Sequence, residues 1–83
     1  MKSWNEENSK LEREFGFNDF SEALAFVNKV GELAQEADHH PDILIHSYKK
    51  VRIILTTHEE GRVTQKDRDL AKKIEQMFQN PGV

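Results

Sequence analysis

The spacing between apolar residues alternates along this chain between a period of two and steps of three and four, and this alternation limits the folds that the chain can adopt. Over residues 10–17, apolar or aromatic side chains alternate with polar ones, a period of two that is typical of a half-buried strand. Arg13 is the misfit on the apolar side of this run. Over residues 20–37, apolar residues recur at steps of three and four, which predicts an amphipathic helix of about five turns.

Both periods return in the second half of the chain. Residues 43–45 are apolar, and apolar residues alternate again over 51–55, so two strands joined by a turn at residues 47–50 are predicted. Trp4 is assigned to a short strand before the first run, with residues 6–9 as the turn. A last helix is predicted from an apolar stripe formed by Leu70, Ala71, Ile74, Met77 and Phe78.

Polar residues mark the helix ends. Asp19 is placed to cap the first helix, with Glu22 three residues on as its capping-box partner, and Thr64 and Asp67 repeat this spacing before the last helix. The first helix must stop before Pro41, because the residue that precedes a proline is steered out of the α region.

The order of elements is therefore strand, strand, helix, strand, strand, helix. Strands joined by short turns run antiparallel, and helices with a single apolar stripe cover one face of a sheet. We predict a single α+β domain over residues 1–83, with a four-stranded antiparallel sheet and both helices on one face.

Composition excludes several classes of function. The 83 residues contain no cysteine, so disulfides and thiolate metal sites are excluded, and a core this small favours self-association. A net charge of −3, with both signs interspersed, does not indicate a nucleic-acid partner. No signal-peptide segment is apparent and no apolar run reaches the ~18 residues of a membrane span, so we expect a cytoplasmic protein with no membrane association.

Three of the four histidines lie in two acidic segments. His39 and His40 fall between Asp38 and Pro41-Asp42, where the first helix leads into the third strand, and His58 stands beside Glu59 and Glu60, where the fourth strand ends. If these strands are hairpin neighbours, the start of one lies beside the end of the other, so His40 and His58 can face one cavity. Histidine exchanges protons near neutrality, and a neighbouring carboxylate makes it a better general acid.

Several of these residues also have a non-catalytic interpretation. A metal site is disfavoured, because His39 and His40 are adjacent and adjacent side chains diverge on any regular backbone. His46 is isolated and is assigned to the surface. Asp67 is either a helix cap or a site residue, and Trp4 either core or a substrate platform. The residues alone predict a histidine acid–base site or a polar binding site in a small α+β domain.

The order of these residues resembles the pterin-4a-carbinolamine dehydratase family across nearly the whole chain. The resemblance rests on the segments 38–42 and 55–58 and on Trp4, Tyr48, Val51, Gly61, Thr64 and Asp67, together with residues 15–20, Ala23 and Phe26. It implies a four-stranded antiparallel sheet with helices on one side, and dehydration of 4a-hydroxytetrahydropterin to quinonoid dihydropterin without metal or organic cofactor. It also implies a homodimer or homotetramer.

By this resemblance, His39 and His58 would be the acid–base pair and His40 would mainly hold the pterin. The substrate pocket would be lined by Pro41, Thr57, Glu59 and Glu60, with Asp38, Asp67 and Trp4 as further substrate-binding candidates. The alternatives are a partner protein that binds the dimerisation helices of a transcription factor, and a binder of another pterin such as a molybdopterin-related compound.

Three positions depart from the family pattern. Gln35 stands where an acidic residue is common, Arg62 where a second glycine is expected, and Lys66 where arginine is frequent. The first change removes a carboxylate from near the histidines, and the third removes a planar fork of donors.

Overall fold

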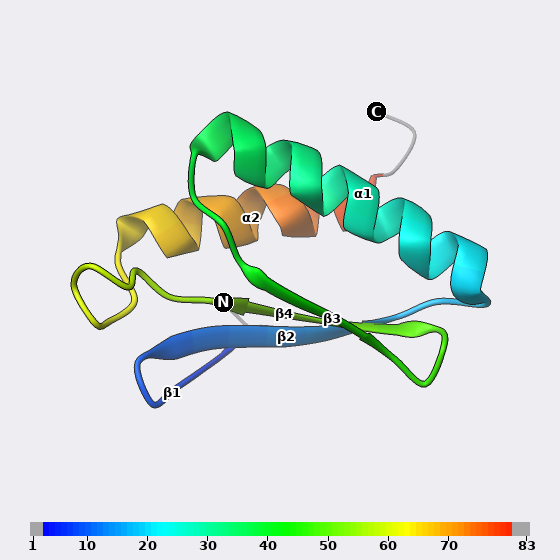
Figure 1. The fold of residues 1–83 in the computed structure, drawn as a ribbon, viewed down its shortest axis with the longest axis horizontal. Helices are drawn as coiled ribbons and strands as arrows, with labels where there is room; N and C mark the ends of the chain where they lie inside the picture. The colour runs from blue at the N-terminus through cyan, green and yellow to red at the C-terminus, as the bar shows by residue number, and fades with distance from the viewer. Residues whose placement is uncertain (1–2, 81–83) are drawn as a thin grey trace.

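The computed structural model describes residues 3–80, which form a four-stranded antiparallel sheet covered on one face by two helices (Figure 1). This arrangement confirms the predicted α+β class. The strands are β1 (Asn5–Glu7), β2 (Lys10–Gly16), β3 (Asp42–His46) and β4 (Lys50–Leu55), and the helices are α1 (Phe20–Ala37) and α2 (Gln65–Gln79). In the sheet the strand order is β1-β2-β4-β3, so β4 is a central strand with β2 on one side and β3 on the other.

Alternation along the strands decides which side chains reach the core. Leu11 and Phe15 of β2 pair with Leu55 and Val51 of β4, and all four are buried beneath the helices. The β1–β2 connection is the two-residue turn Asn8-Ser9, with positive φ at both residues as in a type I′ turn. The first strand starts at Asn5, so Trp4 lies just before it and not within it. The turn is shorter than the predicted 6–9, which is possible here because asparagine tolerates positive φ.

The helix α1 begins where its cap was predicted. Asp19 Oδ1 accepts the backbone N–H of Glu22 at 2.8 Å. The Glu22 carboxylate, however, accepts the N–H of Asn18 at 3.0 Å instead of that of the cap residue.

The end of α1 fixes the position of His39. Asp38 adopts the left-handed conformation (φ 51°), which turns the chain sharply after Ala37. The His39 N–H then bonds back to the Ala34 carbonyl at 3.1 Å, and the Asp38 N–H to that of Gln35 at 3.2 Å, as in a Schellman ending. The first histidine of the pair is thus anchored to the helix by its own backbone.

Arg13, the misfit of the sequence pattern, is accommodated by a partner on α2. Its guanidinium is paired with the Glu75 carboxylate and lies over the Phe15 ring, 4.2 Å from the ring centroid. Trp4 is 5% exposed, and its indole N–H donates to Glu75 at 3.0 Å. Burial alone would raise the pKa of Glu75, but the bonds from Arg13 and Trp4 outweigh it and hold that pKa below its ordinary value.

Candidate active site

The three clustered histidines line one cleft at the end of the sheet. The cleft has a volume of about 190 Å³ and is lined by Asp38, His39, His40, Thr56, His58 and Glu59. It forms because β3 and β4 are antiparallel neighbours, with Asp42 opposite Ile54, so the segment entering β3 meets the segment leaving β4 (Figure 1). The convergence that the sequence predicted is therefore observed.

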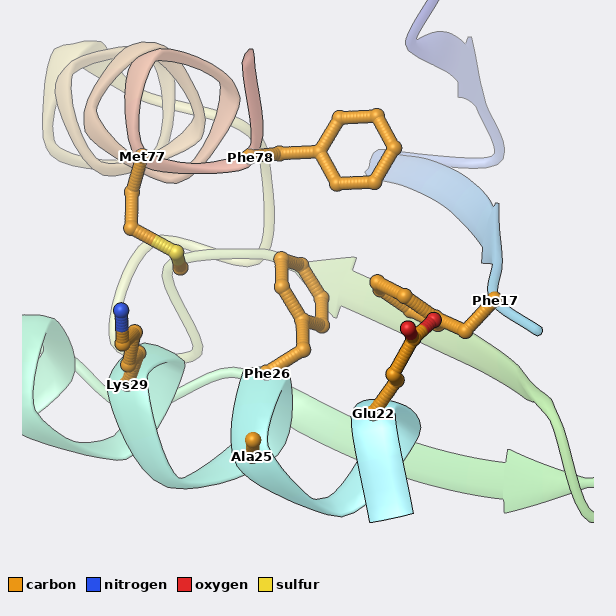
Figure 2. Close-up of a pocket in the computed structure, with 7 residues that line it drawn as sticks. All are labelled: Phe17, Glu22, Ala25, Phe26, Lys29, Met77 and Phe78. Atoms are coloured by element: carbon orange, nitrogen blue, oxygen red, sulfur yellow. The ribbon is translucent and has the colours of Figure 1, made fainter. Parts of the chain in front are cut away.

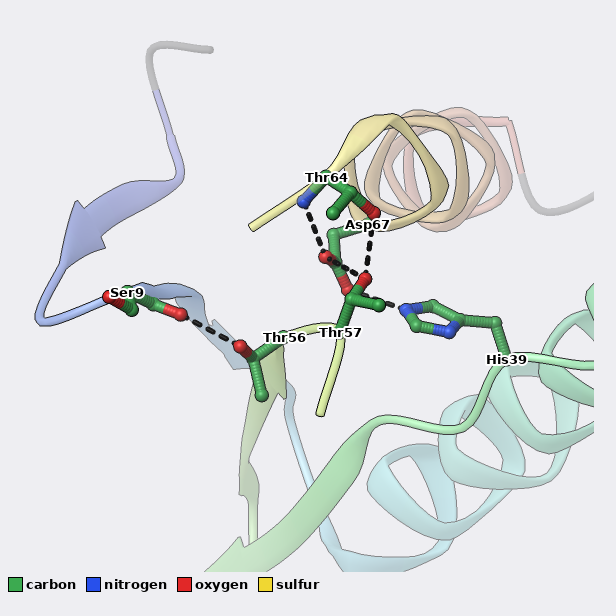
Figure 3. A network of polar contacts seen from close by, with 6 residues as sticks. All are labelled: Ser9, His39, Thr56, Thr57, Thr64 and Asp67. Carbon is green, nitrogen blue, oxygen red and sulfur yellow. Dashed lines mark hydrogen bonds and ion pairs between the residues drawn. The ribbon is translucent and has the colours of Figure 1, made fainter. Parts of the chain in front are cut away.

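His39 is backed by a buried carboxylate. Its Nε2 lies 2.5 Å from Oδ1 of Asp67, the third residue of α2, which is 0% exposed (Figure 3). The other oxygen, Oδ2, accepts the Thr64 backbone N–H at 2.9 Å and the Thr57 hydroxyl at 2.8 Å. One carboxylate therefore caps α2 through Oδ2 and holds the His39 ring through Oδ1, while the substrate-binding role of Asp67 stays a prediction.

The charge on Asp67 determines which nitrogen of His39 carries a proton. Burial would raise the pKa of Asp67, but the hydrogen bonds from His39, Thr64 and Thr57 outweigh it and hold the pKa below its ordinary value. An ionised carboxylate only accepts, so His39 must donate from Nε2–H. In the neutral imidazole Nδ1 then keeps its lone pair, and this atom makes no hydrogen bond to residues 3–80.

The other two histidines are more open to solvent. His40 is exposed, and its Nε2 lies 2.6 Å from the side-chain oxygen of Gln35, so the family position that is commonly acidic supplies a neutral acceptor here. His58 is exposed and its ring makes no hydrogen bond within residues 3–80. The rings of His39 and His40 thus point to different partners, as expected for adjacent residues.

The remaining predicted site residues are spread around the cleft. Asp38 and Glu59 line it, whereas Thr57 is buried behind it and Pro41 is half-buried beside it. Glu60 forms an exposed ion pair with Arg62 at 2.9 Å. Trp4 lies in the hydrophobic core instead of the cleft lining, and its substrate-binding role stays a prediction, as do the roles of the others.

Sequence reasoning did not assign two residues that the structure brings to the site. Thr56 lines the cleft, and its hydroxyl donates to the Ser9 carbonyl at 2.8 Å, which ties the site to the β1–β2 turn (Figure 3). Gln35 was noted only as a departure, although its place on the last turn of α1, five residues before His40, was a usable signal for contact.

A larger cavity lies between the two helices, and its lining differs from that of the histidine cleft. It measures about 320 Å³ and is lined by Phe17, Glu22, Ala25, Phe26, Lys29, Met77 and Phe78 (Figure 2). Its walls are mainly aromatic and aliphatic, and the Glu22 carboxylate is engaged at the start of α1. The smaller histidine cleft is therefore the better candidate for proton-transfer chemistry.

Two further observations concern residues 3–80 alone. In this part of the chain, no three or more histidine, aspartate or glutamate side chains are gathered so that they could hold a metal ion. Neither of its helices is long and apolar enough to cross a membrane.

The fold and the cleft define a class: a small α+β domain that presents several histidines, one of them backed by a buried aspartate, at one end of an antiparallel sheet. The family model described as pterin 4 alpha carbinolamine dehydratase matches residues 1–77. This chain belongs to that family.

Relatives in several organisms support this assignment. Proteins provisionally named pterin-4-alpha-carbinolamine dehydratase are 53% identical in Trichormus variabilis, over 93% of this chain and 82% of the relative, and 47% identical in Sulfolobus acidocaldarius, over 89% and 80%. The crystal structure of a transcriptional coactivator/pterin dehydratase from Brucella melitensis is 32% identical with a TM-score of 0.84, covering 90% of this chain and 81% of that one. A pterin dehydratase-like RuBisCO assembly factor of the alpha-carboxysome, 23% identical with a TM-score of 0.75 over 90% and 88%, shares the fold.

Proposed function

We propose that this chain dehydrates a 4a-hydroxytetrahydropterin to the quinonoid dihydropterin. The C4a–O bond breaks and the hydroxyl leaves as water, which requires one proton. The N5 lone pair forms the new C4a–N5 double bond, and N5 releases one proton. The proposal is carried by one observation: in a member of this family, a histidine held by a buried aspartate shares a cleft with a solvent-open histidine.

The two proton transfers balance, so the protein needs one group that gives a proton and one that takes it. We assign these tasks to His39 and His58. Asp67 holds the His39 ring by Nε2, which leaves Nδ1 to exchange a proton with the substrate. The His58 ring is exposed and lines the same cleft. Positioned acid–base groups of this kind typically contribute ~10²–10⁴-fold in rate.

The other residues of the cleft would bind the pterin. His40, held by Gln35, would contact the ring. The carboxylates of Asp38 and Glu59 would accept hydrogen bonds from the amide and amino edge of the heterocycle, which carries donors. Since a core of this size favours self-association, we also propose a homodimer or homotetramer.

The test compares three histidine-to-alanine variants. The rate of dehydration of chemically generated carbinolamine is followed by its absorbance for His39→Ala, His58→Ala and His46→Ala. The first two should lose roughly 10²-fold or more in kcat/KM. His46 is the matched control, because it lies on β3 and contacts Glu14 instead of the cleft residues.

Three outcomes would distinguish the proposed function from its alternatives. A His58→Ala protein that folds normally and turns over at the wild-type rate contradicts the acid–base role of that residue. A wild-type protein that binds 7,8-dihydrobiopterin but does not accelerate dehydration would favour the alternative of a non-catalytic pterin binder. A wild-type protein that neither binds nor reacts would favour the partner-protein alternative.

A further inference from the structure

Thr57 is a buried polar residue to which the proposed mechanism gives no task. Its side chain is 2% exposed and lies behind the cleft, not in its lining. Its hydroxyl donates to Asp67 Oδ2 at 2.8 Å and also lies 2.7 Å from the Thr64 hydroxyl (Figure 3). A hydroxyl has one proton to give, so the proton in the second contact must come from Thr64. The Thr64 hydroxyl thus donates to Thr57 and Thr57 donates to Asp67, the carboxylate that also accepts the hydrogen bond from His39.

These hydrogen bonds fix the rotation of the Asp67 carboxylate. Oδ2 has two donors, the Thr57 hydroxyl and the Thr64 backbone N–H at 2.9 Å, and these place Oδ1 toward His39 Nε2 at 2.5 Å. If the Thr57 hydroxyl is removed, Oδ2 loses a donor in a site that water does not reach. The carboxylate is then held less firmly, and so is the imidazole in front of it.

The backbone of the same residue holds the segment that carries His58. Thr57 N–H bonds to the Arg62 carbonyl at 3.1 Å, and the Thr57 carbonyl accepts the N–H of Gly61 at 2.9 Å and that of Glu60 at 3.0 Å. His58 is the next residue in this closed loop. Both histidines of the proposed acid–base pair therefore depend on the position of one threonine, one through its side chain and the other through its backbone.

We infer that Thr57 is the positioning residue of this site: its hydroxyl orients His39 through Asp67, while its backbone fixes the loop that presents His58. This inference rests on the proposed function for its catalytic consequence. The geometric claim about Asp67 and His39 does not depend on that function. Placement errors of about 1 Å at a reacting group can cost ~10²-fold, so a loosened ring is expected to affect kcat.

The experiment uses two substitutions that remove opposite parts of the side chain. Thr57→Val keeps the shape and loses the hydroxyl, and Thr57→Ser keeps the hydroxyl and loses a methyl group. For Thr57→Val we expect kcat to fall roughly 10- to 100-fold with KM little changed, and for Thr57→Ser we expect kcat within about threefold of wild type. A purely structural role in packing would reverse this order, because serine leaves the larger void.

A second readout is independent of turnover. The Asp67 carboxyl is titrated by carbon NMR, with Asp67→Asn for assignment. Because the Thr57 hydroxyl lowers the pKa of Asp67, that pKa should rise in Thr57→Val and stay at the wild-type value in Thr57→Ser.

These results separate two failures. If the wild-type protein does not dehydrate the carbinolamine, the proposed function fails, yet the titration still tests the hydrogen-bond chain. If Asp67 titrates identically in the valine and serine variants, the inference about Thr57 is overturned whatever the rates are. Should Thr57→Val not fold, Thr57→Cys replaces it, since a thiol is a weak donor of serine shape and should give a smaller change in the same direction.

Discussion

Asp67→Asn should make the protein less stable at neutral pH and should remove a specific acid sensitivity. The wild-type carboxylate accepts three hydrogen bonds, from His39, Thr57 and Thr64. A hydrogen bond to a charged acceptor contributes about 1 kcal/mol more than one to a neutral acceptor, so three bonds give ~3 kcal/mol. Burying an amide costs less than burying a carboxylate, which offsets part of this loss. We therefore expect the free energy of unfolding to fall by roughly 1–3 kcal/mol at pH 7.

The sign of the pH dependence follows from the direction of the pKa shift. The pKa of Asp67 is below its ordinary value in the folded protein, so its contribution is fully present above that ordinary value, about 3.9. The contribution is lost as the pH falls through the lower, folded-state pKa. Asparagine does not titrate, so the stability gap between wild type and Asp67→Asn should be nearly constant at neutral and mildly acidic pH and should close as the pH is lowered below about 3.9.

The measurement is urea unfolding followed by the fluorescence of Trp4, the one tryptophan, at several pH values. Asp69→Asn is the matched control, because Asp69 lies on the same helix, is exposed and, within residues 3–80, has its side chain hydrogen-bonded to Gln65 alone, at 2.8 Å. Its effect should stay within about 0.5 kcal/mol. A gap for Asp67→Asn that is constant with pH, or that widens in acid, would refute the assignment of the buried charge.

The same variant should also change the protonation of His39. Asparagine can keep its oxygen toward Thr57 and Thr64 only if its NH₂ group faces His39 Nε2. Nε2 must then accept, and the ring proton moves to Nδ1. Nitrogen NMR of the histidine rings reports this change of tautomer directly. Under the proposed mechanism, a strong loss of dehydration should accompany it.

Two other predictions concern the scaffold. Gly31→Ala should raise the free energy of unfolding by about 1 kcal/mol, because Gly31 is inside α1 and a Cβ there meets open space, whereas Gly61→Ala should lower it by about 1–2 kcal/mol, because Gly61 has φ +66°. Equal signs for the two variants in chemical denaturation would contradict this reasoning. Arg13→Ala should cost about 2 kcal/mol or more, since it leaves the partly buried Glu75 without its cation, and adding Glu75→Gln should recover part of the loss.

The sequence sufficed for most of the fold because both helices and the strands β2 and β4 have a regular apolar period. The two alternating runs, 10–17 and 51–55, pair in the sheet as β2 and β4, and both apolar stripes that were predicted to be helical cover one face. Prediction was weaker where the outcome depends on a contact between distant residues. Arg13 did not fit the apolar pattern, and only the structure shows that Glu75 pairs with its guanidinium and that an aromatic ring lies against it.

The sequence predicted that histidines share a cleft, but it did not predict the hydrogen bonds that hold them from behind. Hairpin geometry places the start of β3 beside the end of β4, which predicts that His40 and His58 share a cavity. Nothing in sequence spacing shows that one carboxylate can cap α2 and hold His39 simultaneously, because that depends on how α2 lies over the segment after β4. For the same reason Thr57 was expected as a lining residue and is found behind the lining.

The left-handed turn at Asp38 has a consequence for engineering this scaffold. Glycine is the usual residue after a helix in this conformation, and replacing Asp38 with glycine would relieve backbone strain and strengthen the fold. Asp38 also contributes its carboxylate to the cleft wall. A screen that selects for heat resistance alone would therefore favour glycine and remove an acidic group from the cleft, so thermal stability and, under the proposed function, pterin binding place opposite demands on this position.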